Sequence, residues 1–239
     1  MAPLEASGDD HASILGEAAR PFSVRGLAIG AVASAPALLS PLGPTASWAL
    51  VAGAGTAVVH LLAVTHLARG RAGFLVPDPG ARRAPPIAVA GRAFALYVLA
   101  AFPFVAAVAA GPTAPSPVEV LAAMLATSLY VPAAIGAVVA SGHGATAFWP
   151  FAWMRIIGTI GPVAYARACS VFAVGVLAAW SLDQGLASAA AKLAVEGPSA
   201  LPYAAVSAFV RTWLVDLVWF AQACALGALL RRERAALGL

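Results

Sequence analysis

The stretch from Gly26 to Ala68 decides the fold, and it reads GLAIGAVASAPALLSPLGPTASWALVAGAGTAVVHLLAVTHLA. It contains no Asp, Glu, Lys or Arg, and its middle is interrupted by the sequence PLGP at 41–44. Proline and glycine end helices and form turns. An α-helix needs about 20 apolar residues to cross a bilayer. The stretch therefore predicts a hairpin of two membrane spans, at about 26–40 and 46–68.

The composition of the whole chain agrees with this interpretation. Of its 239 residues, 62% are hydrophobic and only 10% are charged. Soluble domains carry about 25% charged residues. The chain is therefore too apolar for a soluble globular domain, and we expect an integral membrane protein with several spans.

Four further apolar runs follow the hairpin, separated by polar or proline-rich connectors such as GPTAPSP at 111–117. The sequence predicts an all-α, polytopic membrane helix bundle of six transmembrane helices. We expect residues 1–21 to form a cytoplasmic N-terminal segment, 22–230 the transmembrane domain and 231–239 a cytoplasmic basic tail. The four further spans are expected at about 93–110, 118–140, 167–183 and 201–230.

The arginines predict the orientation of the bundle, because cytoplasmic loops collect Lys and Arg. With six spans, both termini and the second and fourth loops lie on one side of the membrane. That side carries twelve of the 14 basic residues, and the opposite side carries only Lys192. We therefore expect cytoplasmic termini, in the cytoplasmic (inner) membrane of a bacterium. The twelve residues are Arg20, Arg25, Arg69, Arg71, Arg82, Arg83, Arg92, Arg155, Arg167, Arg231, Arg232 and Arg234.

The segment at about 144–160 is too short and too interrupted to cross the membrane. It carries Trp149, Trp153 and Arg155, and tryptophan is enriched at both membrane interfaces. We expect it to lie in the cytoplasmic headgroup region as an interfacial helix, with Arg155 facing lipid phosphate.

Ionisable residues inside a membrane are the default candidates for function, because a charge there is costly. The candidates for an intramembrane polar or transport site are Asp216, Arg211 and His60. At 1.5 Å per residue, Asp216 lies about 22 Å and His60 about 14 Å from the cytoplasmic face. A proton relay between them would have to bridge the difference in depth. The alternative is structural, with each group hydrogen-bonded to a neighbouring helix, and Gln222 and Thr56 supply further polar groups for such bonds.

Arg211 lies nearer the outer interface, five residues before Asp216. Five residues correspond to about 140° around a regular helix, so the two side chains do not share a face. A partner for either group must therefore come from elsewhere in the bundle.

The sequence contains no catalytic motif. It lacks HExxH, a phosphate-binding GxxxxGK[ST] run and any cluster of cysteine and histidine. We therefore expect no enzymatic activity, no cofactor and no metal site. Because the arginines bracket apolar runs, we expect membrane lipids as partners and no nucleic acid.

Part of the second half resembles a broad group of uncharacterised multi-pass bacterial membrane proteins. The resemblance rests on LYVP at 129–132, FWP at 148–150, RIIG at 155–158, PVAY at 162–165 and LGALLR at 226–231. It implies a helix bundle and no particular activity. From the sequence we expect a non-enzymatic accessory or assembly subunit of a membrane complex, with other membrane subunits or further copies of the chain as possible partners. The alternative is a small transporter or channel with a polar path through His60 and Asp216.

Overall fold

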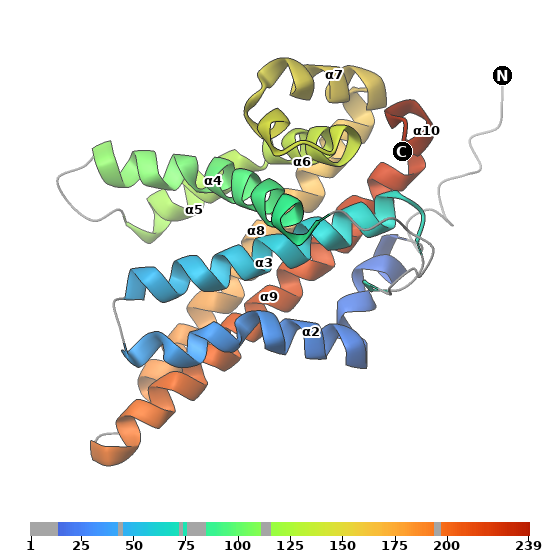
Figure 1. Cartoon of the computed structure of the whole chain (residues 1–239). Coiled ribbons are helices and arrows are strands. Elements are labelled where there is room, and N and C mark those ends of the chain that lie inside the picture. The colour runs from blue at the N-terminus through green and yellow to red at the C-terminus, as the bar shows by residue number, and fades with distance from the viewer. Residues whose placement is uncertain (1–13, 43–44, 72–73, 76–84, 111–115, 194–196) are drawn as a thin grey trace.

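The computed structural model is helical, with no strand among the residues that it describes, which are 14–42, 45–71, 74–75, 85–110, 116–193 and 197–239 (Figure 1). Four of its helices are long and apolar enough to cross a membrane. The prediction of an all-α chain with several candidate spans is confirmed. The four helices are α3 (Thr45–Ala68), α4 (Pro86–Ala110), α8 (Pro162–Lys192) and α9 (Ala200–Arg232).

Two further candidate spans are bent pairs. Helical segments Ile14–Phe22 and Val24–Leu39 meet at 61°, and α5 (Pro117–Thr127) meets α6 (Val131–Ser141) at 41°. The first pair contains η1 (Arg20–Phe22), α2 (Val24–Ser34) and most of η2 (Ala35–Leu42). By length and composition, the described residues therefore hold four candidate spans, or up to six if each bent pair counts as one.

Prolines lie next to both breaks and where α2 passes into η2, because proline has no backbone N–H to donate and its ring clashes with the preceding helical turn. Pro21 lies in η1, Pro36 follows the end of α2, and Pro132 lies in the first turn of α6. Gly26 permits the first bend because it has no side chain. A Cβ there would lie 2.2 Å from the Pro21 carbonyl oxygen, too close for any larger residue. Pro103, in contrast, lies inside α4 without ending it.

Short helices connect α6 to α8 and complete the C-terminal end. They are η3 (Gly144–Phe148), α7 (Pro150–Ile160) and, after α9, α10 (Arg234–Leu237). With 11 residues, α7 is about 17 Å long and too short to cross a bilayer. The segment predicted to be interfacial is therefore two short helices.

Helices α8 and α9 are longer than the apolar runs that predicted them. Helix α8 continues nine residues past Asp183, and it is joined to α9 through η4 (Gly197–Ser199). Backbone hydrogen bonding continues a helix whether or not its side chains are apolar. The α8–α9 hairpin therefore extends beyond the ends of α2 and α3, at the lower left of Figure 1.

Helix α9 lies at the centre of the bundle. It packs against α3, α8, α2 and η2. Within its most apolar 18-residue window, 67% of the residues are buried, compared with 17% in α4. Phe220, Cys224 and Leu226 on α9 have no exposed surface. The C-terminal half of α9 is thus the core around which the other spans are arranged.

Glycines allow this close packing. A Cβ on Gly227 of α9 would lie 2.8 Å from the Leu67 Cβ and 3.0 Å from the Val64 carbonyl oxygen of α3. Gly30 of α2 packs in the same way against the Trp213 ring of α9. Small residues let membrane helices approach each other closely. The GxxxG spacing at 26–30 therefore serves packing within the chain.

Candidate functional site

Asp216 lies where three elements meet. Its side chain projects from α9, and the residue is only 3% exposed. The Ser34 hydroxyl, at the end of α2, donates a hydrogen bond to Asp216 Oδ2 at 2.7 Å. The Thr56 hydroxyl of α3 donates to Asp216 Oδ1, also at 2.7 Å. Each carboxylate oxygen thus has its own donor, and the carboxylate joins α9 to both helices of the N-terminal hairpin.

Both hydroxyls also have a second acceptor. Ser34 Oγ lies 2.9 Å from the Gly30 carbonyl oxygen, and Thr56 Oγ1 lies 3.0 Å from the Ala52 carbonyl oxygen. A hydroxyl carries one proton, so it donates either to the carboxylate or to its own helix at any moment. The two hydroxyls can therefore stay hydrogen-bonded whether or not Asp216 accepts from them.

His60 lies one helical turn beyond Thr56 on the same face of α3. Its Nε2 is 2.8 Å from Gln222 Oε1 of α9, and Gln222 Nε2 donates at 2.9 Å to the Phe172 carbonyl oxygen of α8. Gln222 fits there because Gly175 has no side chain, and a Cβ at Gly175 would lie 2.6 Å from Gln222 Cγ. This second set of bonds links α3, α9 and α8.

Arg211 forms an ion pair with Asp183 of α8. Its Nη2 donates to Asp183 Oδ2 at 2.6 Å, and its Nε donates to Oδ1. Two parallel bonds between a guanidinium and a carboxylate form a strong, geometrically specific pair. The partner of Arg211 thus lies on another helix, α8, and is not Asp216.

These three sets of contacts form a polar ladder along α9, made of Arg211, Asp216 and Gln222 with their partners. The structure brings Asp216 and His60 onto one interface, between α3 and α9, but gives them different partners. No hydrogen bond joins the two in the described part of the chain. Each rung instead connects α9 to one or two other helices.

Two partners in the ladder were not among the residues singled out by sequence. Ser34 is a fully buried serine in an apolar span, and Asp183 marked only the end of one. A hydroxyl within a span, or a carboxylate near its end, is a weak signal in a single sequence. Such a residue can be assigned to a polar contact only when its partner on another helix is known.

A further buried carboxylate holds the N-terminal segment against the end of α9. Glu17 is 6% exposed and accepts a hydrogen bond from Arg20 Nη2 at 2.6 Å. Arg231 Nη1, in the last turn of α9, lies 3.3 Å from Glu17 Oε1. Ion pairs among Glu17, Arg20 and Arg231 thus attach segment Ile14–Phe22 to the C-terminal end of α9.

The predicted interfacial residues have different surroundings. Trp149 is 60% exposed, and Arg155 is also exposed. Trp153 instead stacks on Tyr130, with ring centroids 5.7 Å apart, and donates from Nε1 to the Ala147 carbonyl oxygen. Trp149 and Arg155 face outward, whereas Trp153 attaches α7 to the bundle.

The comparisons with known proteins add no relative. No family model, curated protein or solved structure matches the chain.

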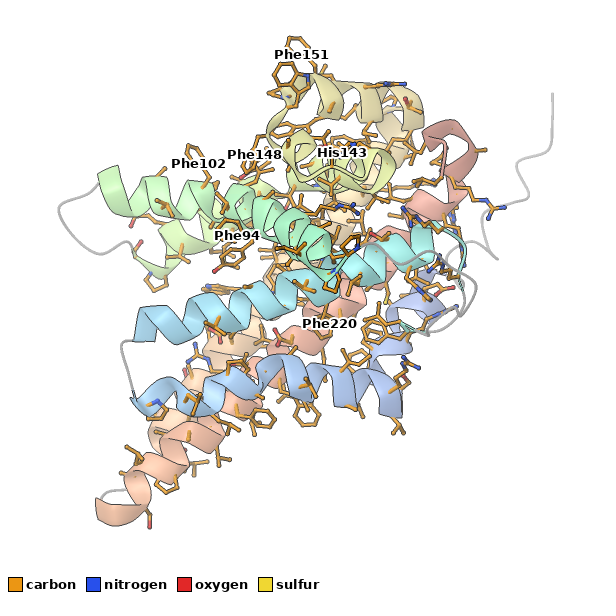
Figure 2. The ribbon with its side chains drawn as sticks, viewed as in Figure 1. Phe94, Phe102, His143, Phe148, Phe151 and Phe220 are labelled. Atoms are coloured by element: carbon orange, nitrogen blue, oxygen red, sulfur yellow. The ribbon has the colours of Figure 1, made fainter. Side chains whose placement is uncertain are left out.

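Many large apolar side chains are exposed on the described helices. On α4, Phe94, Val98, Phe102 and Val105 are all exposed and follow one another at helical spacing. Figure 2 shows Phe102 on the outer side of α4, and Phe151 at the outer edge of α7. Such a face fits lipid chains or another membrane helix.

Proposed function

We propose that this protein is a multi-pass subunit of the bacterial inner membrane, with a non-enzymatic accessory or assembly function in a membrane complex. The observation that carries the proposal is the polar ladder. Its groups bind other residues of the same chain, and they fasten α9 to α2, α3 and α8. Polar groups within a membrane are energetically costly. Because these groups hold the helices of the chain together, they support a stable structural subunit, which we call the scaffold function.

The exposed stripe on α4 is the surface that we assign to a membrane partner. Helix α4 is the least buried of the four continuous spans. The partner would be another membrane subunit or a second copy of this chain. Large apolar side chains at helical spacing offer the packing on which association within a bilayer depends.

The test is affinity purification in a mild detergent, with identification and stoichiometry of the proteins that accompany the chain. We expect a stoichiometric partner whose recovery falls in the Phe94→Ala/Phe102→Ala variant. A matched control is Val174→Ala/Leu177→Ala, which shortens two exposed side chains of α8. A chain that purifies alone and monomeric, or equal loss in both variants, would contradict the proposal.

The proposal includes six spans with both termini in the cytoplasm. In a Cys169→Ala/Cys224→Ala background, we expect a membrane-impermeant thiol reagent to label Pro115→Cys in intact cells. The same reagent should label Gly80→Cys only after the membrane is opened. We expect this labelling pattern because, with six spans, twelve of the 14 basic residues fall on the side of the termini, and cytoplasmic loops collect Lys and Arg. The reverse labelling pattern would overturn the orientation.

The second candidate function is transport of a proton or small solute along a path through His60 and Asp216. It is favoured by the burial of Asp216 beside the point where α2 passes into η2. Transporters place binding groups near the middle of the membrane, beside interrupted helices. Thr56 and His60, one turn apart on α3, put both polar contacts on one interface.

The two functions are distinguished by the variants Asp216→Asn and His60→Ala in liposomes. The scaffold function predicts a lower yield of folded protein in both, with no flux in either variant or in the wild type. The transport function predicts wild-type flux that both variants lose while they remain folded. Flux that persists unchanged in both variants would exclude a relay through these residues.

A further inference from the structure

Among the described residues, no positively charged side chain pairs with the Asp216 carboxylate. The residue is buried and lies in α9, a candidate span. Its two hydrogen-bond donors, the Ser34 and Thr56 hydroxyls, are neutral. The ion pairs in the described part of the chain belong instead to Glu17 and Asp183. A buried charge is costly unless it is paired, so a small cation beside Asp216 would supply the missing opposite charge.

The groups around the Asp216 carboxylate are oxygen atoms, which are the ligands that sodium, magnesium and calcium ions bind. Ser34 Oγ and Thr56 Oγ1 each lie 2.7 Å from a carboxylate oxygen. The next oxygens outward are the Gly30 and Ala52 carbonyls, 2.9 and 3.0 Å from the two hydroxyl oxygens. Helices α2, α3 and α9 thus bring two carboxylate oxygens and two hydroxyl oxygens to one place.

The second acceptors of the two hydroxyls allow them to change role. A hydroxyl that coordinates a cation turns its proton away from that cation and presents its lone pairs to it. Ser34 and Thr56 can do this by donating to the Gly30 and Ala52 carbonyl oxygens. The same hydroxyls therefore donate to the carboxylate in the absence of a cation and act as ligands when a cation is bound. Neither state leaves a hydroxyl proton without an acceptor.

An interrupted helix lies beside these oxygens. Helix α2 ends at Ser34 and passes into the 3-10 helix η2, in which Pro36 has no backbone N–H to donate. A stretch of 3-10 helix within a longer helix often marks a functional position. Transporters that couple to sodium form their ion sites at interrupted helices near the middle of the membrane. The position of Ser34 therefore agrees with an ion site at this point.

The composition of the site selects a small monovalent cation. No group of three or more His, Cys, Asp or Glu side chains that could hold a metal occurs among the described residues, so the ligands do not suit zinc or another transition metal. The single carboxylate balances one positive charge, and a divalent ion would leave an uncompensated charge inside the bundle. The oxygens lie 2.7 to 3.0 Å apart. A smaller ion needs less separation of the helices than a larger one, which favours sodium over potassium.

We propose that Ser34, Thr56 and Asp216 bind one sodium ion between α2, α3 and α9. Asp216 supplies the opposite charge, and the two hydroxyl oxygens are further ligands. The proposal does not rest on the scaffold function or on the transport function. Sodium binding without flux in liposomes would make the ion a structural one, and sodium binding with flux would make it the coupling ion.

The experiment measures binding of radiolabelled sodium to the purified, full-length protein in mild detergent, with choline chloride keeping the ionic strength constant. We expect saturable binding of one ion per chain, and a rise in Tm of about 5 °C at saturating sodium. Asp216→Asn should abolish both effects. Ser34→Ala and Thr56→Ala should each weaken sodium binding about tenfold, the usual effect of losing one interaction with a charged group.

The matched control is Ser170→Ala on α8, whose hydroxyl donates to the Ala166 carbonyl of its own helix. It should bind sodium like the wild type, and potassium should displace the bound sodium only weakly. Absence of saturable binding, equal displacement by potassium, or unchanged binding in Asp216→Asn would each overturn the proposal. If Asp216→Asn lowers the yield of folded protein, Ser34→Ala and Thr56→Ala decide the question, and wild-type affinity in both would exclude the site.

Discussion

The variant Ser34→Ala/Thr56→Val should be less stable than Asp216→Ala. This is expected although the double variant keeps Asp216, the charged member of the Asp216 cluster, which consists of Ser34, Thr56 and Asp216. Removing both hydroxyls leaves the buried Asp216 carboxylate without its two side-chain donors. Hydrogen bonds to a charged group contribute about 1.5 to 3 kcal/mol, and the cost is greatest when the charged group is left unpaired. We expect a loss of at least about 2 kcal/mol in the free energy of unfolding.

Removing the carboxylate should cost less, because both hydroxyls have a second acceptor. In Asp216→Ala they turn to the carbonyl oxygens of Gly30 and Ala52, so neither is left without a hydrogen bond. We expect a loss of about 1 kcal/mol, near the average for hydrogen bonds between membrane helices. Adding Asp216→Ala to the double variant should restore most of the lost stability.

The measurement is reversible unfolding in mixed micelles, with the same three variants compared at one pH. The decisive quantity is the order of their stabilities rather than any single value. A triple variant less stable than the double one would contradict the arrangement of the Asp216 cluster, because no unpaired carboxylate would then have been relieved.

The variant Gly227→Ala should lower the free energy of unfolding by about 1 to 3 kcal/mol, the usual cost of overpacking a tight core. The new Cβ would lie 2.8 Å from the Leu67 Cβ and 3.0 Å from the Val64 carbonyl oxygen. The second neighbour is backbone, so no side-chain rotation relieves the contact. Helix α3 must move away from α9, and it carries Thr56 and His60 with it.

The control for this prediction is Gly185→Ala on α8. Nothing lies within 4 Å of a Cβ at that position. Alanine is a better helix former than glycine by up to about 1 kcal/mol, so this variant should be as stable as the wild type or more so. Thermal unfolding in detergent measures both, and equal stability of the two variants would exclude the close approach of α3 and α9.

Hydropathy predicted the fold class because each span needs a long apolar run. It failed at the ends of the helices, since α8 continues through Asp183 and for nine residues beyond it. Asp183 illustrates the reason: its charge is matched by Arg211 on another helix, and no single run of sequence contains that information. The bends at the first and fourth spans follow from prolines visible in the sequence, although their angles do not.

The candidate site was predicted in part. The rarity of charge within the spans identified Asp216, Arg211 and His60, and helix periodicity correctly separated Arg211 from Asp216. Their partners depend on how α2, α3 and α8 are arranged around α9, which local sequence does not specify. Ser34 in particular looks like any small residue of an apolar helix until Asp216 lies beside it.

The position of α9 in the chain has a consequence for biosynthesis. The ribosome makes α9 after every other described span, yet α9 completes the contacts of Ser34, Thr56, His60 and Asp183. Until α9 is inserted, those polar groups in the earlier helices lack their partners on α9. Ser34 and Thr56 can wait at little cost, because each hydroxyl bonds to its own helix in the meantime. Chains arrested before α9 is made should remain inserted but loosely packed, and so be favoured substrates for membrane proteases.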